Sequence, residues 1–119
     1  MVKNQEYSNI GKFDRLIRDK IPEITMKSEG KTIITKILAA EDKFIFYLFK
    51  KVKEEAEELI ESQDKGSDDT KKELADLFEL LDTIIEVKGF NRNDIVNIQM
   101  EKREKSGGFK KRLLMIGKT

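Results

Sequence analysis

The sequence predicts a mainly all-α protein, an antiparallel bundle of helices in a single domain over residues 1–119. Apolar residues recur every three or four positions in two long segments, about 41–62 and about 69–88, which is the spacing of amphipathic helices. The polar turn SQDKGSDD between them is short, so the two helices should be antiparallel neighbours. At 119 residues the chain is long enough for one core and too short for two.

The N-terminal part of the chain predicts one short helix and one short strand. Residues 1–12 are polar and predict a loose terminus. Pro22 suits the first turn of a helix over about 22–29, and Gly30 suits its left-handed end. Residues 32–38 belong to the stretch KTIITKIL, which alternates β-branched and polar side chains as a strand does.

The C-terminal part predicts a third helix and a second strand. Asn91 is a suitable N-cap for a helix over about 92–105, which SGG ends at 106–108. The tail FKKRLLMI has the composition of a strand. The pattern therefore also allows a small two-stranded sheet from 32–38 and 110–116.

The composition excludes several kinds of chemistry. The chain contains no Cys and no His, which excludes thiolate and imidazole metal ligands, disulfides, and Cys or Ser-His-Asp nucleophilic sites. Any bound metal must be a hard cation held by oxygen, which means Mg²⁺, Mn²⁺ or Ca²⁺.

The charge and hydropathy of the chain bear on its partners and location. The net charge is +1, so we expect no general attraction to nucleic acid or to an anionic membrane. No apolar run approaches the roughly 18 residues of a transmembrane helix, and residues 1–11 lack the apolar stretch of a signal peptide. We therefore expect a cytoplasmic protein.

A helical wheel of residues 41–62 separates an apolar face from an acidic one. The apolar face comprises Ile45, Leu48, Val52, Ala56 and Leu59. Glu55 borders this face, and Glu58 lies about 60° outside it. The acids expected to point toward water are Glu54, Glu57 and Glu61.

The wheel of residues 69–88 has the same arrangement, with an apolar face of Leu74, Leu77, Leu81 and Ile85. Glu73 borders this face and Asp76 lies about 60° beyond, whereas Glu79, Asp82 and Glu86 point outward. Counting outward from the turn, Glu58 comes level with Glu73. In the same count Glu55 comes level with Asp76. Four converging carboxylates would repel one another, and a divalent cation would offset that repulsion.

Two ordinary explanations compete with a metal site. Acids on helices usually form the solvated face, which is our expectation for Glu54, Glu57, Glu61, Glu79 and Glu86. Thr70-x-x-Glu73 also has the spacing of a capping box, in which the Glu73 carboxylate would bind the start of its own helix.

Glu55-x-x-Glu58, a gap of fourteen residues and then Glu73-x-x-Asp76 resemble the ExxE…ExxD signature of the MazG-like, all-α nucleoside triphosphate pyrophosphohydrolases. The flanks RLIRDKIPEI and EKREKSGGFKKRLL are similar to a short-chain subgroup described as phosphoribosyl-ATP pyrophosphohydrolase-like. The likeness covers about residues 12–116.

The resemblance implies a Mg²⁺ site made by Glu55, Glu58, Glu73 and Asp76, with Mn²⁺ as a substitute. It implies hydrolysis of a nucleotide between the α and β phosphates, which releases a nucleoside monophosphate and pyrophosphate. Because the chain has no His, the base must be the metal-activated water itself or a carboxylate, for which Glu54 and Glu58 are the candidates beside Glu55.

Two other functions stay open at this stage. One is the hydrolysis of phosphoribosyl-ATP in histidine synthesis, which would use the same site. The other is a non-catalytic helical module that binds a partner through its apolar faces. Nothing in the residues identifies a base pocket, so the nucleotide is not specified.

The basic segments would then contact the phosphates. The candidates are Arg15, Arg18, Lys20, Lys51, Arg103, Lys105 and Lys111, joined by Lys110 and Arg112. Arginine suits this role because its guanidinium makes bidentate contacts with phosphate. Surface charge explains Arg18 and Lys20 equally well, Lys51 could instead pair with an acid, and Gly107 is most simply the C-cap of the third helix.

We also expect a homodimer or a larger homo-oligomer. Large apolar residues lie beyond the core faces of the two long helices, namely Phe44, Phe46, Tyr47, Phe78 and Leu80. Exposed together, they would form a larger apolar patch than monomers usually tolerate. A second copy would cover them in a four-helix arrangement, and the resemblance likewise implies dimers with the nucleotide site near the subunit boundary.

Overall fold

The computed structural model describes residues 14–119, and all of its regular secondary structure is helical. The helices are α2 (Ile21–Glu29), α3 (Glu41–Ser62), α4 (Ser67–Val87) and α5 (Arg92–Ser106). The all-α class is therefore confirmed for the described part of the chain. The predicted loose terminus, 1–12, lies outside the described residues.

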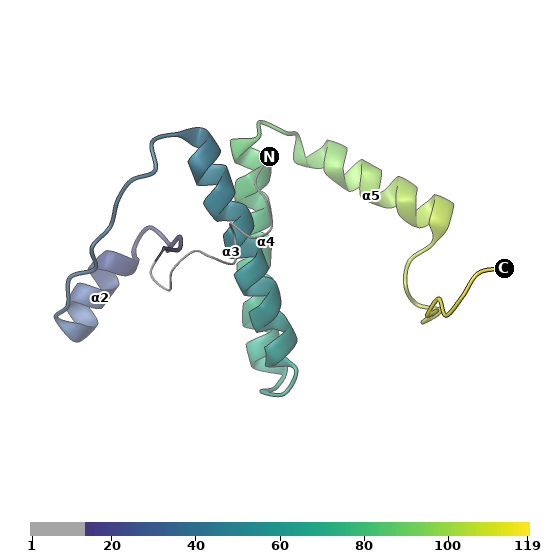
Figure 1. Ribbon diagram of the computed structural model, residues 1–119, viewed down its shortest axis with the longest axis horizontal. Coiled ribbons are helices and arrows are strands. Elements are labelled where there is room, and N and C mark those ends of the chain that lie inside the picture. The colour runs from purple at the N-terminus through teal and green to yellow at the C-terminus, as the bar shows by residue number, and fades with distance from the viewer. Residues whose placement is uncertain (1–13) are drawn as a thin grey trace.

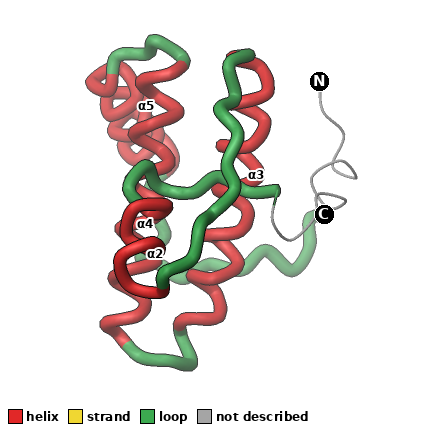
Figure 2. The backbone as a smooth tube through the Cα atoms, turned by 90° about the vertical axis from the view of Figure 1, so that its left-hand side faces the viewer, coloured by secondary structure: helices red, strands yellow, loops and turns green. Residues whose placement is uncertain are grey.

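Helices α3 and α4 form an antiparallel hairpin at the centre of the molecule (Figures 1 and 2). This pair makes the one extensive interhelical contact among residues 14–119. Leu48, in the middle of the predicted apolar face of α3, is only 2% exposed. Helix α2 lies on one side of the hairpin and α5 projects away on the other (Figure 1). The seam between α3 and α4 is thus the place where distant parts of the sequence meet.

Local signals set most of the helix ends where they were predicted. Helix α3 has the predicted bounds, and α2 ends at Gly30, whose φ of 66° is left-handed and whose N–H donates to the Met26 carbonyl at 3.0 Å. The Asn91 side chain accepts a hydrogen bond from the Asn93 N–H at 2.8 Å and so caps α5. Gly107 ends the same helix, and its N–H donates to the Arg103 carbonyl.

The start of α4 corrects the predicted capping box. The helix begins at Ser67, two residues early, after Gly66 with a φ of 124°. Thr70 therefore lies inside the helix, where its hydroxyl is 3.0 Å from the Ser62 hydroxyl and 3.2 Å from the Gly66 carbonyl oxygen. These contacts hold the turn between the two helices, and Glu73 is left free of the helix start.

The predicted two-stranded sheet is wrong: the structure has no strand over 32–38 or 110–116. Ile34 is 96% exposed and Ile37, on the other face of the alternating pattern, is 91% exposed, so neither face is buried along the segment. In the second segment, Arg112 has a φ of 62°, and its N–H donates to the Phe109 carbonyl in a turn. The two segments lie on opposite sides of the hairpin (Figure 1), so neither can supply backbone hydrogen bonds to the other.

Candidate metal centre

Three glutamates meet where α3 packs against α4. Glu55 and Glu58 of α3 and Glu73 of α4 each offer one carboxylate oxygen, and these three oxygens lie within 4.8 Å of one another. Glu55 is only 6% exposed, whereas Glu58 is exposed. The cluster therefore has a buried end and a solvent-facing end. The structure thus brings together three of the four carboxylates that the helical wheels selected.

The predicted register of the hairpin holds for Glu58 and fails for Asp76. We expected Glu58 beside Glu73, and their carboxylate oxygens meet in the cluster. Nearer the turn, the Ser62 and Thr70 hydroxyls lie 3.0 Å apart, which agrees with the same register. We also expected Asp76 beside Glu55, but Asp76, one turn further along α4 than Glu73, is not one of the three clustered acids.

The cluster leaves carboxylate oxygens without donors. The Oε2 atoms of Glu55 and Glu73, like that of neighbouring Glu54, are buried and accept no hydrogen bond from any of the described residues. A buried polar atom without a partner is costly, so such an atom calls for an explanation. A cation that these oxygens could bind is one explanation.

The donor set fits a hard divalent cation. Mg²⁺ binds oxygen at about 2.1 Å, which places two of its ligand oxygens roughly 3 Å apart when adjacent and roughly 4 Å apart when opposite. The three glutamate oxygens lie within 4.8 Å of one another, so small side-chain rotations would bring them to these separations. Because Glu58 is exposed, a cation held by the cluster would also be open on that side to water and phosphate oxygens.

The surroundings of Glu55 favour its protonated form. Burial raises the pKa of Glu55 from 4.5 to about 7, and the hydrogen bonds that a protonated Glu55 could share with Glu58 and Glu73, together with the charge of Glu58, act in the same direction. The Lys51 ammonium, 3.6 Å from Glu55 Oε1, lowers the pKa but does not cancel the rise. Without a bound cation, the proximity of Glu58 and Glu73 therefore favours a proton on Glu55.

This pKa shift predicts how the stability of the metal-free protein depends on pH. Between about 4.5 and 7, folded Glu55 keeps a proton that the unfolded chain releases, so its contribution to stability falls as the pH rises through this range. We expect Glu55→Gln to be at least as stable as the wild type at about pH 8 without metal, because Gln cannot ionise. Urea unfolding in a chelator at about pH 5 and about pH 8 measures the difference.

Two further measurements test whether the loss of the Glu55 charge explains the result. Mg²⁺ should raise the melting temperature of the wild type more than that of Glu55→Gln, by mass action on the folded state. A metal-free Glu55→Gln variant that is less stable than the wild type at the higher pH would show that Glu55 makes a structural hydrogen bond or ion pair.

Asp76 is held by the N-terminal segment instead of joining the cluster. Arg18 Nη2 donates to Asp76 Oδ1 at 2.7 Å, and both side chains are partly exposed to solvent. Arg18 was predicted as a phosphate contact and Asp76 as a metal ligand, so the pair joins two candidate site residues that are 58 positions apart in the chain.

Lys50 is a residue at this site that the sequence reasoning missed. It is 7% exposed, and its Nζ donates to the Asp14 carbonyl at 3.0 Å and to Glu54 Oε1 at 3.2 Å. The wheel placed this side of α3 in water, because it did not include Asp14, whose carbonyl accepts the Lys50 hydrogen bond. Glu54 is accordingly half-buried and not water-facing as predicted. The spacing of Lys50 and Glu54, four apart on a helix, was the available signal.

Lys51 lies at the edge of the cluster. Its Nζ is 3.5 Å from Glu54 Oε2 as well as 3.6 Å from Glu55 Oε1. Lys51 is therefore placed for both predicted roles, the ion pair with an acid and the phosphate contact. An ammonium that pairs with these acids is also near the place where a phosphate would meet a bound cation.

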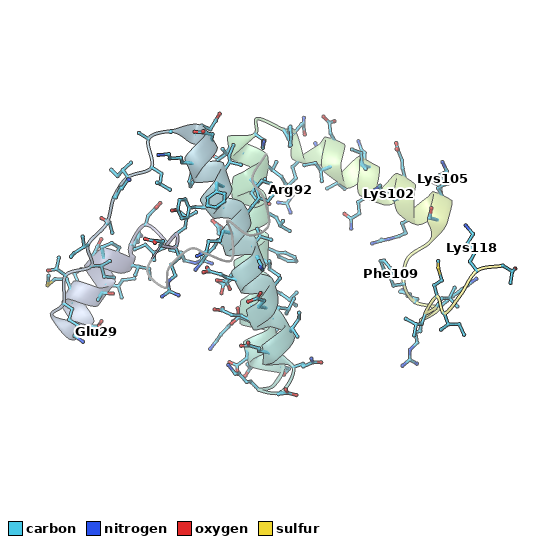
Figure 3. The ribbon with its side chains drawn as sticks, viewed as in Figure 1. Glu29, Arg92, Lys102, Lys105, Phe109 and Lys118 are labelled. Carbon is cyan, nitrogen blue, oxygen red and sulfur yellow. The ribbon has the colours of Figure 1, made fainter. Side chains whose placement is uncertain are left out.

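The remaining basic candidates do not gather at the cluster within one chain. Arg15 and Lys20 are exposed on the N-terminal segment. Lys105 lies near the end of α5 that points away from the hairpin (Figure 3), and Arg103 and Lys111 are exposed in the same region.

The structure and the comparisons add two general findings. Among residues 14–119, no helix combines the length and apolarity that crossing a bilayer requires. Comparison of the chain with protein-family models, curated proteins and solved structures finds no match.

Proposed function

We propose that this protein is a Mg²⁺-dependent nucleotide pyrophosphohydrolase with a MazG-like helical bundle, which cleaves between the α and β phosphates and releases a nucleoside monophosphate and pyrophosphate. The observation that carries the proposal is the cluster of Glu55, Glu58 and Glu73, with buried oxygens that lack donors. The spacing Glu55-x-x-Glu58…Glu73-x-x-Asp76, which resembles that enzyme superfamily, supports the same assignment.

The three glutamates would hold the cation across the α3–α4 seam, with Asp76 as a fourth ligand once it is released from Arg18. Bound Mg²⁺ supplies charge that stabilises the phosphate oxygens and acidifies the attacking water. Lys51, beside the cluster, would contact the same phosphates.

Glu58 is better placed than Glu54 to accept the proton of the attacking water. Glu54 Oε1 accepts a hydrogen bond from Lys50, and Lys51 lies 3.5 Å from Glu54 Oε2, so protonation of Glu54 would weaken two ion pairs. Glu58 is exposed, and no Lys or Arg among residues 14–119 forms an ion pair with it. A proton acceptor must reach the water, so access favours Glu58.

A screen for pyrophosphate release tests the proposal. Canonical, modified and phosphoribosylated nucleotides, including phosphoribosyl-ATP, would be assayed with Mg²⁺, with Mn²⁺ and with a chelator. We expect turnover of at least one nucleotide that requires the cation and yields monophosphate and pyrophosphate in equal amounts. Release of inorganic phosphate instead would contradict cleavage between the α and β phosphates.

A non-catalytic interaction module is the second candidate, because α5 and the tail expose many large apolar residues. Those that are more than half exposed are Ile98, Met100, Phe109, Leu113, Leu114, Met115 and Ile116. Titration calorimetry with Mg²⁺ separates the two functions, because a module of this kind would show no saturable cation site.

A further inference from the structure

The N-terminal segment, residues 14–20, is attached to the hairpin at two points. The Asp14 carbonyl accepts a hydrogen bond from buried Lys50 on α3, and Arg18 donates to Asp76 on α4. The first contact is largely shielded from solvent, because the Lys50 side chain is only 9% exposed. The second is more open, which makes the Arg18–Asp76 contact the easier of the two to break.

Arg18 and a cation at the glutamate cluster would act on the same carboxylate. Asp76 lies three residues after Glu73, so both side chains occupy the same face of α4 on successive turns. A divalent cation bound by Glu73 would attract the Asp76 carboxylate. It would also repel the Arg18 guanidinium, since both are positively charged.

We propose that Arg18 competes with the divalent cation for Asp76, so that cation binding releases the N-terminal segment from α4. The proposal rests on the proposed function only in requiring a cation at the glutamate cluster. The released guanidinium is then free to make a bidentate contact with phosphate, beside the cation that recruits the same phosphate.

The first test compares the Mg²⁺ affinity of Arg18→Gln with that of the wild type by titration calorimetry. Removing the competitor should tighten Mg²⁺ binding about two- to fivefold, the range that corresponds to an exposed ion pair. Arg92→Gln is the matched control, because Arg92 of α5 forms a comparable ion pair with α4, the helix that carries Asp76. Its Nη1 atom lies 3.2 Å from Asp82 Oδ1, and both side chains are similarly exposed. Arg15→Gln controls for the loss of one positive charge from the same segment. Both controls should bind Mg²⁺ like the wild type.

The second test follows the segment itself. The chain has no Cys, so Asp19→Cys provides a single attachment point for a spin label on the exposed part of the segment. If the cation and Arg18 compete, linkage requires that the cation also weaken the ion pair. Addition of Mg²⁺ should therefore increase the mobility of the label in the wild-type background and change it little in the Arg18→Gln background.

The outcomes separate this proposal from the proposed function. Equal Mg²⁺ affinities of the wild type and Arg18→Gln, or a label that does not respond to Mg²⁺, would overturn the competition while cation-dependent turnover still stood. A tightening that is equally large in Arg15→Gln would also overturn it, since charge alone would explain the result. The absence of any saturable Mg²⁺ binding would overturn both proposals.

Discussion

Replacing Glu55 with Gln is expected to reduce Mg²⁺-dependent nucleotide turnover by at least about 100-fold, because a catalytic cation contributes several kcal/mol and each 1.4 kcal/mol is a factor of ten in rate. Glu55 is the buried member of the cluster and one of the two whose Oε2 atom lacks a donor, so its loss should weaken the site most. Asp76→Asn should have a similar effect on turnover if Asp76 becomes a ligand. Steady-state assays of pyrophosphate release measure both changes.

The matched control is Glu57→Gln, which makes the same chemical change two residues away. Glu57 is exposed on the other side of α3, so this variant should keep most of the activity. Circular dichroism should show that all of these variants retain the helices. If Glu57→Gln were as damaging as Glu55→Gln, the assignment of the inward-facing acids would be wrong.

In solution the protein is expected to be a homodimer or a larger assembly. The radius of gyration is 18.0 Å, against about 13.5 Å for a compact domain of this length. Leu48 is the one fully buried apolar side chain among residues 14–119, whereas Phe78 on α4 is 65% exposed. A second copy packed against α3 and α4 would bury such residues in a four-helix arrangement. Sedimentation velocity or light scattering at micromolar concentration measures the assembly state.

A single substitution tests whether Phe78 contributes to the contact between copies. Burying a Phe side chain stabilises a contact by about 1.5–3 kcal/mol, so Phe78→Ser should weaken association roughly 10- to 100-fold. Glu79→Ser, at the next position on α4, is the control and should leave the assembly intact, because Glu79 was predicted to face water and is exposed. A wild-type monomer that is fully active at micromolar concentration would contradict the shared core.

The apolar residues used for the oligomer prediction divide into two groups in the structure. Phe46 and Tyr47 pack edge to face with ring centroids 5.2 Å apart, and both are half-buried within one chain. Phe44 and Leu80 are also half-buried, which leaves Phe78 as the member of the predicted patch that is mainly exposed. Nine of the 19 exposed large apolar residues among residues 14–119 lie instead on α5 and the tail. The tail residue Phe109, for example, is 98% exposed (Figure 3).

The sequence by itself determined the helices and the acids that line their seam. Proline, glycine and asparagine act on their own neighbours, and the helical repeat depends on a few consecutive turns, so Pro22, Gly30, Asn91 and the bounds of α3 could be predicted locally. The same periodicity placed Glu55 and Glu73 beside the apolar faces, where the structure has them.

Only the tertiary structure decided which groups meet across the chain. The cluster that Glu55 joins contains Glu58 and Glu73 and not Asp76, because which acids of α4 face Glu55 depends on how the two helices pack. The alternating pattern of residues 32–38 found no strand to pair with, because a strand is stable only when another segment supplies its hydrogen bonds. The burial of Lys50 and the hold of Arg18 on Asp76 likewise come from a segment that no helical wheel includes. These contacts join residues far apart in the chain, and spacing within one helix carries no information about them.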